Sequence, residues 1–80
     1  MSLKLRIVSP EKIIFNGEVD SVIAPGNMGE FQVLENHAPI ISLLESGKVM
    51  YDDAQGRHEQ MIASGFIEVQ NNQVSLCVEL

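Results

Sequence analysis

The chain has 80 residues, of which 45% are hydrophobic and 20% charged, and its formal net charge is −6. This length fits one hydrophobic core, so we expect a single domain over residues 1–80. Eleven acidic against five basic side chains disfavour nucleic acid and anionic lipid as partners, because both select for clustered lysine and arginine.

Alternation of apolar and polar residues predicts strands from the start of the chain. Leu3, Leu5 and Ile7 alternate with polar neighbours and predict a first strand, which Pro10 ends because proline cannot donate to a ladder. The next predicted strands are Lys12–Phe15, closed by an Asn16-Gly17 turn, then Glu18–Ala24, stopped by Pro25-Gly26, and Phe31–Leu34.

The second half of the chain continues the pattern. Ile40–Glu45 would also suit one face of a short helix, but its length between Pro39 and Gly47 favours a buried strand. Two hairpins should follow: Lys48–Asp52 with His58–Ala63 around Asp53–Gly56, and Phe66–Gln70 with Gln73–Leu80 around Asn71-Asn72. About eight to ten short strands without a normal helix predict an all-β fold, a small β-sandwich or flattened barrel.

Few residues offer chemistry. Cys77 is the only cysteine, which excludes an intrachain disulfide, and without a secretory signal it indicates a reducing, cytoplasmic environment. One cysteine with the distant His37 and His58 makes neither a nucleophile–base pair nor a zinc site, and we expect Cys77 to be structural. We therefore expect no catalytic residue, no cofactor, no metal and no small-molecule substrate.

Two other features leave alternatives open. Lys48 could be the modified lysine of a biotinyl or lipoyl carrier domain, although the sequence around it lacks the usual neighbours of such a lysine. The segments Gly26–Glu30 and Asn36–Pro39 concentrate glycine, proline, an acid, a histidine and Met28. They are either turn chemistry alone or an interaction surface held on a rigid sheet.

The order of several motifs resembles a known family. They are Ser9-Pro10-Glu11-Lys12, Phe15-x-Gly17-Glu18-Val19-Asp20-Ser21-Val22, Pro25-Gly26-x-x-Gly29-Glu30-Phe31-x-Val33-Leu34-x-Asn36-His37-Ala38-Pro39, Ser64-Gly65-Phe66-x-Glu68-Val69 and Asn72-x-Val74. Together they are similar to the N-terminal β-sandwich domain of the epsilon subunit of the rotary F-type ATP synthase.

The resemblance implies a non-catalytic central-stalk (rotor) subunit that couples ATP synthesis or hydrolysis to proton transport. Its partners would be the gamma subunit and the membrane c-ring, at the cytoplasmic face of the bacterial plasma membrane, without membrane insertion of its own. Carried over by motif, Met28, Gly29, Glu30 and His37 would contact the c-ring, and Ser9 and Ser42 would contact gamma.

The chain departs from the family pattern in several places. Gln32 stands where glycine is usual, Glu35 where proline is common, and Gly65 is single where two glycines are frequent. Most family members also continue into a C-terminal helical hairpin that inhibits ATP hydrolysis and in some binds ATP. No such stretch is present before Leu80, so we expect both activities to be absent.

Overall fold

The computed structural model describes residues 2–80, which form nine strands and no helix. The strands are β1 (Leu3–Val8), β2 (Ile13–Val19), β3 (Ser21–Gly26), β4 (Gly29–Val33), β5 (Ile40–Leu44), β6 (Gly47–Asp53), β7 (Gly56–Ile62), β8 (Ser64–Gln70) and β9 (Gln73–Glu79). The prediction of an all-β fold with eight to ten short strands is confirmed. Ile40–Leu44 is a strand as expected, but the prediction that it is buried is wrong, since Ile41 and Leu43 are 77% and 64% exposed.

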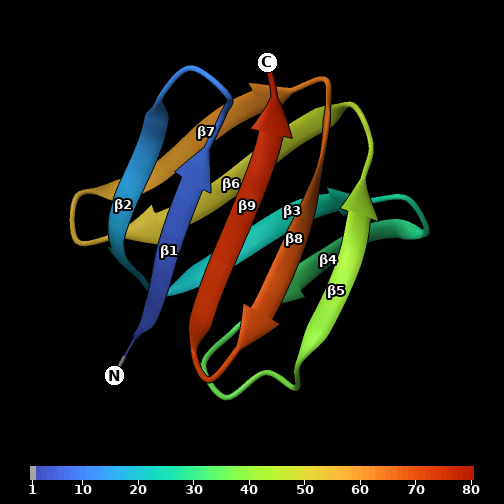
Figure 1. Ribbon diagram of the computed structural model, residues 1–80. Coiled ribbons are helices and arrows are strands. Elements are labelled where there is room, and N and C mark those ends of the chain that lie inside the picture. The colour runs from blue at the N-terminus through green and yellow to red at the C-terminus, as the bar shows by residue number, and fades with distance from the viewer. Residues whose placement is uncertain (1) are drawn as a thin grey trace.

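The strands form one curled sheet with two layers (Figure 1). The first layer has the order β2-β1-β9-β8-β5, and the second has the order β4-β3-β6-β7. They join where Gly26 of β3 pairs with Leu44 of β5. All neighbours are antiparallel except β1 and β9, which run parallel side by side.

The core lies between the two layers and follows from the period-two alternation of the strands. Leu3, Leu5 and Ile7 of β1 are fully buried, while Lys4 and Arg6 between them face solvent. An aromatic contact connects the layers, since the rings of Phe15 on β2 and Tyr51 on β6 lie 4.6 Å apart. Such pairs add about 1 kcal/mol beyond simple burial.

The predicted Asn16-Gly17 turn is wrong. Both residues lie within β2, where Asn16 pairs with Arg6 and Gly17 pairs with Leu5, and the chain turns at Asp20 instead. A Cβ on Gly17 would lie 3.2 Å from Cζ of Phe15. Gly17 therefore makes room for the Phe15 ring, and its place in the sequence reflects packing rather than a turn.

The predicted stop at Pro25-Gly26 also lies too early. Both residues belong to β3, and the chain reverses at Asn27-Met28 before entering β4. Pro25 has no N–H to donate, but it still contributes an acceptor there, since its carbonyl accepts a hydrogen bond from the amide of Glu45 at 2.8 Å. The two later hairpins turn where predicted, with Asn71 and Asn72 at φ 53° and 61°.

Candidate docking surfaces

The β3–β4 hairpin presents three of the residues predicted to contact the c-ring. Met28 is 94% exposed at its tip, and Gly29 and Glu30 follow it as the first residues of β4. Gly29 has φ 121°, a conformation that side-chain-bearing residues rarely adopt, so glycine permits this tight reversal. The hairpin is tied to β5 by a hydrogen bond from the amide of Asn27 to the carbonyl of Leu43 at 3.1 Å. An exposed methionine and a carboxylate are thus held on a fixed backbone.

His37 lies at the other end of β4 from Met28. Its loop is anchored to the β8–β9 turn, because the amide of Asn36 donates to Oδ1 of Asn72 at 2.6 Å (Figure 1). Nδ1 of His37 lies 2.7 Å from the carbonyl oxygen of Ala38, within its own loop. Five residues of β4 separate the two loops, a span of about 14 Å. The structure therefore does not bring the four predicted c-ring residues into one cluster.

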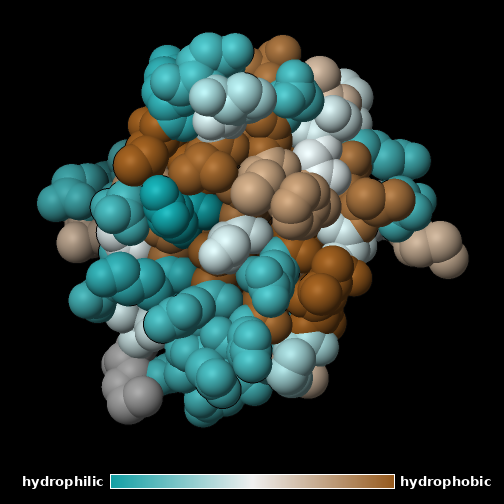
Figure 2. Space-filling view, in the orientation of Figure 1, coloured by the Kyte–Doolittle hydropathy of each residue, from teal (hydrophilic) through white to brown (hydrophobic). Residues whose placement is uncertain are grey.

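An apolar row crosses the outer face of the first layer. The register aligns one outward-facing residue from each of its five strands: Leu43, Phe66, Cys77, Val8 and Ile13. Leu43 is 64% exposed, Phe66 45% and Ile13 55%, and Cys77 and Val8 are half-buried between them. Figure 2 shows a brown and tan band across this face, with hydrophilic side chains above it and at lower left, and a further brown area at lower right. Large apolar side chains aligned in this way are typical of an interaction surface.

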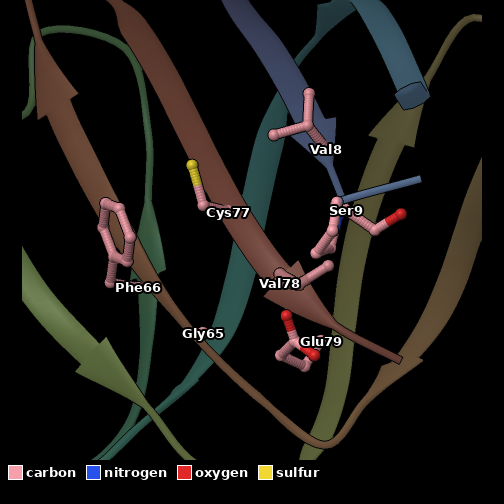
Figure 3. Close-up of a pocket in the computed structure, with 8 residues that line it drawn as sticks. Val8, Ser9, Gly65, Phe66, Cys77, Val78 and Glu79 are labelled. Carbon is pink, nitrogen blue, oxygen red and sulfur yellow. The ribbon is translucent and has the colours of Figure 1, made fainter. Parts of the chain in front are cut away.

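The centre of this apolar row is a shallow groove (Figure 3). Phe66, Cys77 and Val8 lie side by side across β8, β9 and β1, with Ser9 and Glu79 at its margin. Gly65 forms part of the floor, and a Cβ there would lie 2.5 Å from the carbonyl oxygen of Cys77. Close approach of β8 to β9 at this point thus depends on glycine.

The two residues predicted to contact gamma, Ser9 and Ser42, differ in their position relative to the apolar row. Ser9 borders the groove, next to the apolar row. Ser42 alternates with the exposed Ile41 and Leu43 on β5, is half-buried, and its hydroxyl donates to the carbonyl of Leu43 at 3.2 Å. The sequence led to no predicted contact for Leu43 or Phe66, although Leu43 follows Ile41 at the two-residue spacing of a strand face.

A charged cluster occupies the β6–β7 hairpin. Arg57 donates to both carboxylate oxygens of Asp52, at 2.9 and 3.0 Å, and the buried Ser21 donates to Oδ2 at 2.9 Å. These hydrogen bonds lower the pKa of Asp52 to about 2, and the bond from Arg57 has the larger effect. Nε2 of His58 lies 2.9 Å from Oδ1 of Asp53, and this hydrogen bond lowers the pKa of Asp53. Each polar group has a structural partner, so the cluster fixes the hairpin.

Burial and the nearby Asp53 carboxylate, in that order, raise the pKa of Tyr51 in the same region. The His58 ring stacks on Tyr51 with centroids 5.2 Å apart, which places it far from the groove at Cys77. Within residues 2–80 no group of three or more histidine, cysteine, aspartate or glutamate side chains is arranged to hold a metal ion. No helix in this part of the chain has the length and hydropathy to cross a membrane.

Nothing supports the carrier alternative for Lys48. It is the second residue of β6 and pairs with Met61 within the ladder, so it does not stand at a hairpin tip. Its Nζ lies 3.5 Å from Oε2 of Glu59, in an exposed ion pair.

Comparison with known proteins identifies the family of the chain. Residues 2–80 match the family model described as "ATP synthase, Delta/Epsilon chain, beta-sandwich domain". The chain is 47% identical to the ATP synthase epsilon chain of Chlorobaculum tepidum, over 94% of this chain and 86% of that one. It is 44% identical to the epsilon chain of Chlorobium limicola, over 98% and 90%. Against the Leptospira interrogans epsilon chain it is 38% identical, over 96% of this chain and 61% of that one.

Solved structures show the same fold at lower identity. A chain of the Euglena gracilis mitochondrial ATP synthase has a TM-score of 0.89 at 21% identity, over 96% of this chain and 50% of that one. A chain from the central stalk and c-ring structure of the Tetrahymena thermophila mitochondrial ATP synthase has a TM-score of 0.84 at 13% identity, over 100% and 65%. With the family model matched over nearly every residue, the chain belongs to the ATP synthase delta/epsilon family, as its β-sandwich domain.

Proposed function

We propose that this chain is a non-catalytic rotor subunit of a bacterial F-type ATP synthase. It links the gamma subunit to the c-ring and so couples ATP synthesis or hydrolysis to proton transport. It works as a peripheral component at the cytoplasmic face of the membrane. The observation that carries this proposal is the similarity to epsilon chains over almost the whole length, including 47% identity across 94% of the chain.

The gamma contact is proposed for the apolar row. This face exposes Leu43, Phe66 and Ile13, and Ser9 lies at its margin. A central-stalk joint must resist torque, and burial of an apolar row on a stiff sheet provides a contact that neither side can shift without exposing apolar surface to water.

The c-ring contact is proposed for the β3–β4 hairpin. Within residues 2–80 no hydrogen bond or ion pair engages the carboxylate of Glu30, and Met28 beside it is almost fully exposed. A free carboxylate on a fixed turn suits a polar partner loop that carries basic residues. Because His37 lies in the loop at the other end of β4, a strand about 14 Å long, a ring surface would have to span both ends of that strand to include it.

Complex formation tests the assignment. The chain is mixed with its cognate gamma subunit and examined by native mass spectrometry, where a one-to-one complex is expected. Leu43→Asn should weaken this complex while leaving the fold intact, because the side chain is mostly exposed. Persistent failure of the unaltered chain to bind gamma would refute the proposed function.

Glu30→Lys tests the ring contact separately. We expect weaker coupling between ATP hydrolysis and proton pumping in reconstituted vesicles, with gamma binding unchanged, because only the hairpin is altered. Asp20→Lys is the matched control, since it makes the same charge change at the opposite end of β3. Full proton pumping by the Glu30 variant would contradict the proposed contact.

A further inference from the structure

The outer face of the first layer is symmetric about its central strand. Its order is β2-β1-β9-β8-β5, so β9 has two strands on each side. In the apolar row, Cys77 is central, Phe66 and Val8 flank it, and Leu43 and Ile13 lie at the ends. Suppose that a second copy faces this one across a two-fold axis that runs parallel to β9, above the outer face. The rotation of 180° exchanges the two halves of the layer, so each apolar residue of one copy would lie opposite an apolar residue of the other.

In the neighbouring outward-facing row, an acidic and a basic side chain occupy equivalent positions on the two sides of β9. The register aligns Ile41, Glu68, Ser75, Arg6 and Asn16. Ser75 lies on β9, and Glu68 and Arg6 occupy equivalent strands on its two sides, both exposed. The same rotation therefore places Glu68 of one molecule opposite Arg6 of another, twice in each pair of molecules.

We propose that, in the absence of a stalk partner, two copies of this chain pair through this face, with a two-fold axis along β9. The occupant is identified by charge complementarity: an acid on β8 faces a base on β1 of the second copy. An axis parallel to the strands also aligns the two sheets, which is a common geometry for sheets packed face to face. Such an interface is isologous, as in most dimers.

The dimer is weak and reversible. The sheet is curled, so its outer face is convex and two copies touch mainly through β8, β9 and β1 (Figure 1). The net charge of −6 on each copy opposes association, and so does Glu79 of β9, which lies near the axis and would face its own copy. The Glu68–Arg6 pairs offset this repulsion locally. The face is also the one proposed for gamma, so self-pairing and gamma binding exclude each other. Only this last consequence rests on the proposed function.

Charge exchange provides the decisive experiment. Sedimentation velocity of the full chain over increasing concentration should show a monomer–dimer equilibrium. Glu68→Arg and Arg6→Glu should each weaken dimerisation by at least about tenfold, because each places like charges opposite one another. The double variant restores opposite charges and should return to within about threefold of the unaltered chain. Asp20→Arg alters net charge as Glu68→Arg does, but away from the face, and should not weaken the dimer.

Two results would overturn the proposal: a monomer at every concentration, or a double variant no better than the single ones. Circular dichroism of each variant confirms folding, since Glu68 and Arg6 are exposed and reversal of their charges should leave the spectrum unchanged.

Cross-linking through Cys77 gives an independent measurement of the dimer. Facing sheets lie about 10 Å apart, too far for a disulfide, so a short bismaleimide should link Cys77 to Cys77. Cross-linking should fall in both single variants and return in the double variant; equal yields in all four proteins would contradict the axis. Added gamma should suppress cross-linking; unaffected cross-linking beside intact gamma binding would refute the shared face but not the dimer.

Discussion

Replacing Gly65 by alanine should destabilise the domain strongly. The added Cβ would lie 2.5 Å from the carbonyl oxygen of Cys77 and 3.1 Å from Cα of Val78. The first distance is about 1 Å shorter than a normal van der Waals contact, and both atoms belong to the backbone of β9, which cannot swing aside. β8 and β9 must therefore separate, which strains the pairing of Gly65 with Val78.

The expected cost follows from the cost of overpacking, about 1–3 kcal/mol, and a backbone obstacle places it near the upper end, at about 3 kcal/mol. In a domain of this size, that lowers Tm by about 15 °C. Gly17→Ala is the matched control, because its Cβ would approach only the tip of the Phe15 ring, at 3.2 Å, and the ring can shift slightly where a backbone cannot. We therefore expect a cost at the lower end of this range, about 1 kcal/mol. Thermal and urea denaturation of the three proteins measures both values. Equal stability of the Gly65 and Gly17 variants would refute the reasoning.

Two further predictions concern the turns. Asn72→Ala should cost about 2 kcal/mol in urea denaturation, because alanine tolerates φ 61° poorly and the bonds to Asn36 are lost, whereas Asn72→Gly keeps the backbone conformation and should cost about half as much. A similar loss in both variants would show that φ contributes little. The pKa of Asp52 is lowered to about 2 from an ordinary value of 3.8, so its contribution is present above about pH 4 and is lost as the pH falls towards 2. Asp52→Asn and Arg57→Gln should each flatten the acid limb of stability against pH, and an unchanged limb would mean that other carboxylates determine it.

Local sequence signals predicted much of this fold. Alternation placed the strands, and Asn71-Asn72 turned as expected because asparagine accepts positive φ. Asn16-Gly17 carried an equally strong turn signal and failed. Its glycine is needed beside Phe15, whose ring packs on Tyr51 from a distant strand. A contact between β2 and β6 is tertiary information that a dipeptide does not contain.

The candidate surfaces, too, could be predicted from the sequence only in part. Met28, Gly29 and Glu30 could be placed on one exposed turn because they are adjacent in sequence. The separation of His37 from them depends on the direction of β4, which no local pattern shows. The apolar row could not be predicted from the sequence either, because it depends on how the strands pair. Leu43, Phe66 and Val8 become neighbours only through the registers of β5, β8, β9 and β1.

The parallel pairing of β1 with β9 has a consequence for biosynthesis. β1, the first strand of this domain, has its second ladder partner in β9, the last strand of the domain, from Lys4 beside Gln73 to Val8 beside Cys77. Until β9 has emerged, β1 can pair only with β2, β8 has an open edge, and the buried side of both strands faces water. Closing so long a loop is slow, and the domain can complete its folding only once β9 is available rather than strand by strand. During that interval these edges are exposed and can pair with those of other chains, so this is the stage of folding at which aggregation is favoured.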